Sequence, residues 1–223
     1  MLIIFDLDDT LIDTSGSYHP FKISLTLKAM IRAGLKVDSE KDALIRLMQI
    51  NQSAGNGKLT IKKFLEEVNW DKQLFDIGVK TYYGVSTTGE CKIKSLPHTL
   101  EVLEELSQEH ILILVSYGDK SEQHNKLLSA GIKENWFKKI IITNKYDKTA
   151  YYQELLNEFS VIPKKTLVCG DKYEGDLLPA KQLGMVTIHF RHGRGKINPP
   201  SLEDVSYSID NIIKLKEIIQ ELK

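Results

Sequence analysis

The chain has 223 residues, of which 42% are hydrophobic and 27% are charged, a composition typical of an ordinary soluble globular protein. Its 30 basic and 30 acidic residues balance, which argues against nucleic acid or an anionic membrane surface as its main partner. No apolar segment approaches a membrane span, the N-terminus lacks the features of a secretory signal, and 2 cysteines are too few for a disulfide framework, so a cytoplasmic protein is expected.

The first predicted element is a buried strand at residues 2–5, Leu-Ile-Ile-Phe, which acidic residues follow directly. Open α/β sheets build their ligand crevices at the carboxyl ends of such strands, so Asp6 and Asp8 are candidate functional residues. Two carboxylates two residues apart can act separately, one as a nucleophile and one as a proton donor. Turn formation and helix capping also explain acidic residues here. A calcium loop is disfavoured, because Leu11 stands where that loop needs glycine.

Residues 15–94 are expected to form a helical block without strands. The block opens with a turn-rich stretch at residues 15–20, and helices follow it. Apolar residues recur at helical spacing in four segments, and no strand pattern interrupts them. The first segment ends at Gly34, and Thr60 is expected to cap the third. The apolar faces are marked by Ile23, Leu27, Met30 and Ile31, by Leu44, Leu47 and Met48, by Ile61, Phe64, Leu65 and Val68, and by Leu74, Phe75 and Ile77.

From residue 95 short apolar strands alternate with helices, beginning with a helix that Pro97 opens. This alternation predicts a parallel sheet covered by helices on both faces, to which the first strand also belongs. The helical block is therefore an insertion within the sheet domain. The later strands are expected at residues 111–115, 140–142, 166–169, 185–188 and 207–209.

Polar side chains follow three of these later strands. Ser116, Tyr117 and Gly118 follow the second strand, and a hydroxyl with exposed backbone N–H groups there suits phosphate oxygens, although a plain turn explains them too. Lys145 and Lys148 both follow the third strand, where most lysines are merely solvated. After the fourth strand stand Gly170 and Asp171, then Asp176, which could also cap a helix.

Taken in order, these residues resemble the four motifs of the haloacid dehalogenase-like hydrolases. The matching residues are Asp6-x-Asp8-x-Thr10, Ser116, Lys148 and Gly170-Asp171 with Asp176. Ser-Tyr replaces the more usual Thr-Asn of the second motif, and Thr149 stands where many relatives have proline. The resemblance covers residues 1–14 and about 95–190. It implies a Rossmann-like α/β catalytic core at residues 1–14 and 95–223, with an inserted α-helical cap domain at residues 15–94.

The resemblance also implies a role for each motif residue. Asp6 is the nucleophile, Asp8 is the general acid and base, and Lys148 (with Lys145 as its rival) grips the phosphoryl group together with Ser116 and Tyr117. Two like charges about 4 Å apart repel by about 4 kcal/mol at an effective dielectric of 20, so a cluster of acids needs a hard cation before it can accept a phosphate. The implied cofactor is Mg²⁺, held by Asp6, the backbone carbonyl of Asp8, Asp171 and Asp176.

The expected function is Mg²⁺-dependent hydrolysis of a small phosphomonoester, such as a sugar phosphate, a nucleotide or a phosphorylated acid. Dehalogenases and phosphonate-cleaving members of the family generally lack the second acid, which Asp8 supplies here. A phosphomutase of the same fold and a non-catalytic regulatory module that binds phosphate or metal remain as alternatives. A dinucleotide-binding domain is disfavoured, because no Gly-x-Gly-x-x-Gly follows the first strand. The oligomeric state cannot be derived from the sequence.

Overall fold

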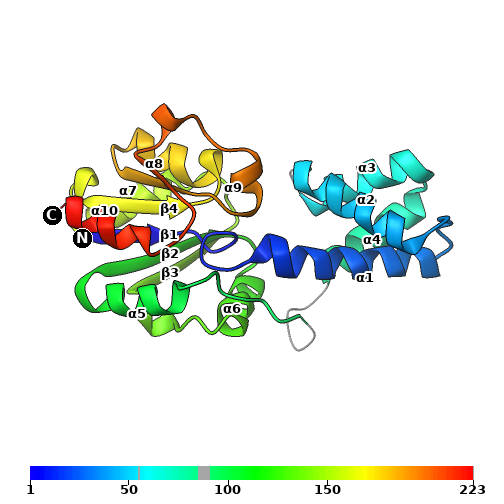
Figure 1. Ribbon diagram of the computed structural model, residues 1–223, viewed down its shortest axis with the longest axis horizontal. Helices are drawn as coiled ribbons and strands as arrows, with labels where there is room; N and C mark the ends of the chain where they lie inside the picture. Colours follow the sequence, from blue (N-terminus) through cyan, green and yellow to red (C-terminus); the bar gives the residue numbers. More distant parts are fainter. Residues whose placement is uncertain (55, 85–90, 223) are drawn as a thin grey trace. The chain divides into compact units, whose positions relative to one another are not determined.

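The computed structural model describes residues 1–54, 56–84 and 91–222. The chain forms two compact units, which are coloured by sequence in Figure 1. Met1–Thr14 and Lys92–Lys223 form the sheet unit, and Ser15–Cys91 form the helical unit. The insertion therefore ends at residue 91, where the sequence analysis placed its end at residue 94.

In the described part of the sheet unit, six parallel strands form one sheet in the order β3-β2-β1-β4-β5-β6. β1 lies in the middle of the sheet, and its four side chains are all completely buried. Its register places Phe5 opposite Leu114 of β2 and Cys169 of β4, so these three strands end close together. The strands are β1 (Leu2–Phe5), β2 (Ile111–Tyr117), β3 (Lys139–Thr143), β4 (Thr166–Gly170), β5 (Val186–Phe190) and β6 (Tyr207–Ile209).

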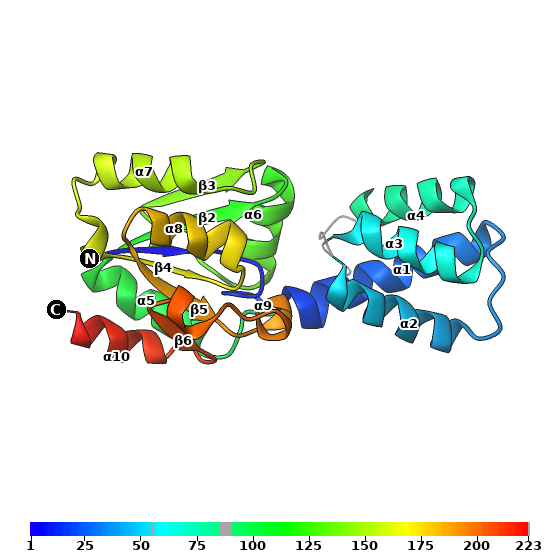
Figure 2. The ribbon, with the colours of Figure 1, turned by 90° about the horizontal axis from the view of Figure 1, so that it is seen from above.

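Helices cover both faces of this sheet, as Figures 1 and 2 show. On one face, Tyr152, Leu155 and Leu156 of α7 pack with Ala180 of α8 against alternate side chains of the central strands. On the other face lie α5 and α6, and Lys216 of α10 forms an ion pair with Glu105 of α5. The helices are α5 (Thr99–Glu109), α6 (Lys120–Ser129), α7 (Thr149–Glu158), α8 (Leu178–Gln182), α9 (Gly193–Ile197) and α10 (Lys214–Glu221).

The described residues of the helical unit form four helices around a core of their own. Aliphatic side chains from all four helices meet there, together with Phe64 and Tyr82. Gly78 lies in the middle of the fourth helix, where it lets that helix approach Met30 and Ile61 closely. The helices are α1 (His19–Arg32), α2 (Glu40–Ser53), α3 (Gly57–Val68) and α4 (Lys72–Gly84), and a π-helical turn (Thr14–Tyr18) precedes them.

The predicted alternation of strands and helices is confirmed, but several element ends differ. The third helix of the insertion begins at Gly57 and not at Thr60, because the side chain of Asn56 accepts a hydrogen bond from the Leu59 N–H at 3.0 Å. Helix α5 begins two residues after Pro97, and His98, its N-cap residue, has a left-handed backbone conformation. Strand β2 continues two residues further than expected, and the short helix α9 was not predicted.

None of the helices in the described part of the chain combines the length and the apolar character needed to cross a membrane.

The close packing at Gly78 can be tested directly. A Cβ atom at this position would lie 2.9 Å from side-chain atoms of both Ile61 and Met30. We expect Gly78→Ala to lower the free energy of unfolding by about 1–3 kcal/mol through overpacking, although alanine favours helix more than glycine does. Urea unfolding followed by circular dichroism measures this. Gly84→Ala is the control, because a Cβ there meets nothing within 4 Å; equal stability of the two variants would contradict the packing described.

Candidate active site

Functional side chains gather at the carboxyl edge of the three central strands. Asp6 follows β1 directly, and its backbone N–H donates to the carbonyl of Cys169 at 3.0 Å, which continues the β1–β4 pairing by one residue. Ser116 is the second-last residue of β2, and Asp171 directly follows β4. The strand order therefore brings residues 6, 116 and 171 to one rim, although 110 residues separate the first two.

Three carboxylates meet at this rim. Asp6, Asp171 and Asp176 each offer one oxygen, and these oxygens all lie within 4.8 Å of one another. All three residues are buried, with exposed fractions of 6%, 1% and 3%. A small residue beside them is needed, because a Cβ on Gly170 would lie 2.6 Å from the Cβ of Asp176.

Lys148 joins two of these acids. Its Nζ donates to Asp6 Oδ1 at 2.7 Å, to Asp176 Oδ1 at 2.5 Å and to the carbonyl of Val115 at 2.8 Å. Only 1% of the side chain is exposed, although it carries a charge. The rival Lys145 is exposed to solvent, so the structure brings Lys148 and not Lys145 to Asp6.

The pKa values of these groups follow from their burial and their shared charge. Burial and the charge of Asp176 raise the pKa of Asp6 to about 6, against the lowering effect of Lys148. Burial, with Asp176 and Asp6 adding to it against Lys172, raises the pKa of Asp171 well above its usual range. Burial lowers the pKa of Lys148, but Asp176 and Asp6 outweigh it and hold the lysine charged. The charged forms of the acids are therefore costly without a further cation.

The acid cluster has the chemistry of a site for a hard divalent cation. Within the residues that the structure describes, neither carboxylate oxygen of Asp171 has a hydrogen-bond partner, although both are buried. A buried carboxylate without donors is expensive unless a cation compensates it. Carboxylate oxygens from Asp6, Asp171 and Asp176 are the ligands that Mg²⁺ prefers, so the residues present fit the predicted metal.

Asp8 lies in a different environment from Asp6. Its Oδ1 accepts hydrogen bonds from Thr14 Oγ1 at 2.5 Å and from Lys126 Nζ at 2.8 Å, and its Oδ2 accepts one from Gln123 Nε2 at 2.8 Å. Burial alone raises the pKa of Asp8, but Lys126, Gln123 and Thr14 outweigh burial and hold the pKa well below its usual range. The Asp8 side chain does not belong to the carboxylate cluster, so its predicted contact with a metal is restricted to its backbone carbonyl.

Sequence reasoning missed Gln123 and Lys126. The two residues lie three positions apart on α6, one helical turn, and so share a face of that helix. Both side chains are buried, which is unusual for a lysine. The sequence itself shows only two polar residues one helical turn apart behind the second motif, and a helix of such polar composition gives no indication of which face is covered.

The residues of the second motif divide between a buried and an exposed position. Ser116 is completely buried, and its hydroxyl accepts a hydrogen bond from Gln123 Nε2 at 2.7 Å. Tyr117 is 49% exposed, and its ring meets that of Tyr146 edge to face, with centroids 5.9 Å apart. Gly118 has a φ of +153°, and a Cβ there would lie 3.1 Å from Gln123, so glycine makes room for this glutamine.

A second group with metal-ligand geometry consists of Asp9, Asp13 and His192. Here His192 Nε2 lies 2.8 Å from Asp13 Oδ1 and 3.9 Å from Asp9 Oδ1, so an ion pair or hydrogen bond already joins the donors. Asp13 and His192 are partly exposed. This group lacks the unpartnered buried carboxylate of the first cluster.

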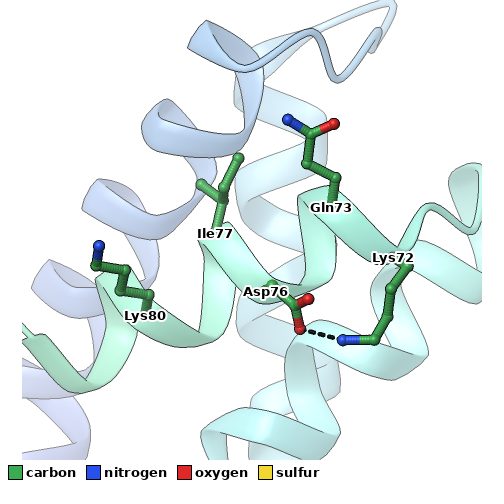
Figure 3. Close-up of a pocket in the computed structure, with 5 residues that line it drawn as sticks. All are labelled: Lys72, Gln73, Asp76, Ile77 and Lys80. Carbon is green, nitrogen blue, oxygen red and sulfur yellow. Dashed lines mark hydrogen bonds and ion pairs between the residues drawn. The ribbon is translucent and has the colours of Figure 1, made fainter.

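A pocket in the helical unit has a different lining from the carboxylate cluster. It is lined by Lys72, Gln73, Asp76, Ile77 and Lys80, which all belong to α4 (Figure 3). Lys72 and Asp76 form an ion pair across one turn of that helix. This pair is largely exposed, and the lining includes none of the motif residues.

The chain is similar to known proteins over most of its length. A family model described as haloacid dehalogenase-like hydrolase matches residues 3–190. The chain is similar to the glyceraldehyde 3-phosphate phosphatase of Methanocaldococcus jannaschii, with 27% identity over 228 residues that cover 99% of this chain and 96% of that protein. It is also similar to the protein of the same description from Pyrococcus furiosus, with 24% identity over 98% of this chain and 92% of that protein.

Solved structures show the same fold. YfnB of Bacillus subtilis, described as a hydrolase of this type and solved with magnesium bound, gives a TM-score of 0.72 at 17% identity, over 98% of this chain and 97% of that chain. A phosphatase of this type from Thermococcus onnurineus gives a TM-score of 0.64 at 19% identity, over 98% and 97%.

The unpartnered carboxylate of Asp171 leads to a stability prediction. We expect Asp171→Asn to raise the free energy of unfolding of the metal-free protein by about 1–3 kcal/mol, because a neutral amide replaces a carboxyl group whose pKa is raised well above its usual range by burial. The same variant should lose most of the stabilisation that Mg²⁺ gives the wild type. Calorimetry with chelator and with Mg²⁺ measures both effects. Glu174→Gln is the control, because Glu174 is an exposed acid in the same loop; an undiminished Mg²⁺ effect in Asp171→Asn would contradict the assignment.

The buried ion pairs of Lys148 lead to the opposite expectation. Lys148→Met leaves the carboxylates of Asp6 and Asp176 facing each other without an ammonium, so we expect a loss of about 3–5 kcal/mol in metal-free stability. Lys145→Met removes an exposed lysine and should change stability by less than about 0.5 kcal/mol. Denaturant unfolding of both variants in chelator makes the comparison. Similar losses in the two variants would show that the ion pairs do not hold the site together.

Proposed function

Since this chain belongs to the haloacid dehalogenase-like hydrolase family, we propose that it is a phosphatase that hydrolyses a small phosphomonoester through Asp6. One observation carries the proposal: the buried carboxylate of Asp6 stands at the end of the central strand, within 2.7 Å of Lys148 and beside the unpartnered carboxylate of Asp171. A nucleophile held between a lysine and a cation-binding acid suits attack on a phosphate ester, which brings negative charge with it.

The first step transfers the phosphoryl group to the enzyme. An oxygen of Asp6 attacks phosphorus in line, a new P–O bond forms, and the bond from phosphorus to the substrate oxygen breaks. Asp8, whose pKa rises when an anionic ester lies beside it, gives a proton to the departing oxygen, so that an alcohol leaves. Lys148 and Ser116 hold oxygens of the phosphoryl group during the transfer, and the lysine charge opposes the charge that develops on them.

The second step releases phosphate. The Asp8 carboxylate accepts a proton from water, and the water oxygen attacks phosphorus of the aspartyl-phosphate. The bond from phosphorus to Asp6 then breaks, which returns the Asp6 carboxylate and releases inorganic phosphate. Asp8 is left protonated, ready to act as the acid in the next cycle.

We propose Mg²⁺ as the cofactor, held by Asp6, Asp171 and the backbone carbonyl of Asp8, with Asp176 supporting the arrangement. When bound, the ion neutralises the carboxylate cluster and polarises the phosphoryl group. Asp176 is already tied to Lys148 at 2.5 Å and accepts a hydrogen bond from the Lys172 N–H at 3.1 Å. These two contacts suit it to orient its neighbours.

Glyceraldehyde 3-phosphate is the first substrate that we propose to test. The relatives described as glyceraldehyde 3-phosphate phosphatases align with nearly the whole of this chain, including the inserted helices. The family resemblance alone does not distinguish hydrolysis from a mutase reaction, in which the phosphoryl group returns to another hydroxyl. The products distinguish the two, because only hydrolysis releases inorganic phosphate.

The proposal is tested by measuring phosphate release from glyceraldehyde 3-phosphate, other sugar phosphates and nucleotides, with Mg²⁺ and with chelator. We expect Mg²⁺-dependent release, which Asp6→Asn reduces on the order of 10³-fold or more because the nucleophile is lost. Borohydride reduction of acid-quenched enzyme should convert the acyl-phosphate at Asp6 to homoserine. Asp38→Asn, which changes an exposed acid of the helical unit, is the control.

Two results would contradict the proposal. One is wild-type activity in Asp6→Asn, which would remove the nucleophile assignment. The other is an isomerised substrate without inorganic phosphate, which would favour a phosphomutase.

A further inference from the structure

We propose that Lys126 and Gln123 of α6 are positioning residues that hold the Asp8 side chain ready for proton exchange with the leaving group. The inference rests on the proposed phosphatase function and adds two residues outside the four motifs to its machinery. It starts from an observation that the motifs leave unexplained: a buried ammonium on α6 ends at the carboxylate of Asp8, 118 residues away in the sequence.

The burial of Lys126 indicates a specific role. Only 8% of its side chain is exposed, whereas most lysines keep their ammonium in water. Taking an ammonium out of water costs several kcal/mol unless a close partner compensates it. Asp8 Oδ1 lies 2.8 Å from Nζ, and the carboxylate of Glu122 on the same helix lies 4.0 Å away. Asp8 is therefore a close partner of this ammonium, and the side chain of Asp8 is itself only 16% exposed.

The hydrogen bonds distinguish the two oxygens of Asp8. A carboxylate oxygen offers two acceptor positions. Thr14 and Lys126 fill both positions on Oδ1, whereas Gln123 fills one of the two on Oδ2. Because Oδ2 keeps one acceptor position free among the described residues, we assign to it both the proton that passes to the leaving group and the proton that returns from water. Three donors on two oxygens also fix the rotation of the carboxylate.

Gln123 connects this carboxylate with the phosphate-binding hydroxyl. Its Nε2 lies 2.8 Å from Asp8 Oδ2 and 2.7 Å from Ser116 Oγ, and it also reaches the carbonyl of Tyr117 at 3.3 Å. The glutamine is 1% exposed and needs Gly118 beside it. A single buried amide thus sets the spacing between the group that exchanges protons and the group that holds phosphate.

Leaving-group dependence separates this role from a general effect on folding or phosphate binding. An alkoxide is a poor leaving group and needs a proton in the transition state, whereas p-nitrophenolate leaves without one. General acid catalysis contributes about 10²–10⁴-fold to such a step. A variant that misplaces Asp8 should therefore slow alkyl esters selectively, whereas a variant that only weakens phosphate binding should slow both kinds of ester alike.

The test is a single-turnover measurement of leaving-group release with Lys126→Met, using glyceraldehyde 3-phosphate and p-nitrophenyl phosphate with Mg²⁺. We expect the rate with glyceraldehyde 3-phosphate to fall about 100-fold and that with p-nitrophenyl phosphate by less than about 5-fold. The concentration of substrate at half-maximal rate should change little for either. Lys164→Met is the control, because Lys164 is an exposed lysine just before β4, at the opposite edge of the sheet.

Equal losses with the two esters, or no loss with either, would overturn the inference. If Lys126→Met does not fold, as judged by circular dichroism, Lys126→Gln carries the same comparison, because it keeps a polar side chain without the charge. Failure of the proposed function has a different signature, since the wild type itself would then release no alcohol from either ester.

Discussion

The structure depends on the contact between a buried lysine and two buried acids. Lys148 donates to both Asp6 and Asp176 at the carboxyl edge of the sheet, where Asp171 adds a third carboxylate. Two carboxylates about 4 Å apart repel by about 4 kcal/mol at an effective dielectric of 20. The single positive charge of Lys148 offsets part of this repulsion in the metal-free fold, but it does not compensate all three carboxylates. The carboxylate of Asp171, whose two oxygens accept no hydrogen bond within the described residues, makes the cluster a place for a cation and, with the cation, for a phosphate.

Two acids separated by one residue acquire opposite properties from their surroundings. Asp6 is buried among other acids, and its pKa is raised to about 6 by burial and by Asp176. Asp8 is partly buried, and Lys126 and its neighbours lower its pKa below the usual range. These pKa directions belong to the metal-free protein. A cation on the carboxylate cluster would lower the pKa of Asp6 and keep this nucleophile ionised, and an anionic ester beside Asp8 would raise the pKa of the proton donor. The difference between the two acids thus comes from Asp176 on one side and from Lys126 and Gln123 of α6 on the other, and not from β1.

The sequence predicted the parallel sheet and the functional residues that directly follow its strands. Apolar runs of four or five residues followed by acid, serine or glycine indicated both the sheet and its functional edge, because parallel strands bring their carboxyl ends together. Lys148 was preferred over Lys145 only through the family resemblance. The sequence around Lys148 and the sequence around Asp6 gave no indication that the two side chains are in contact. Gln123 escaped prediction, because burial of one face of a polar helix depends on what packs against it, which local pattern does not reveal.

Anomalous scattering from crystals of the protein grown with Mn²⁺ tests most directly whether the buried acids bind a cation. We expect a peak within coordination distance of carboxylate oxygens of both Asp6 and Asp171, with Asp8 contributing only its backbone carbonyl. A peak at Asp9, Asp13 and His192 in place of this one, or no peak beside Asp171, would contradict the claim that the buried acids are assembled around a cation.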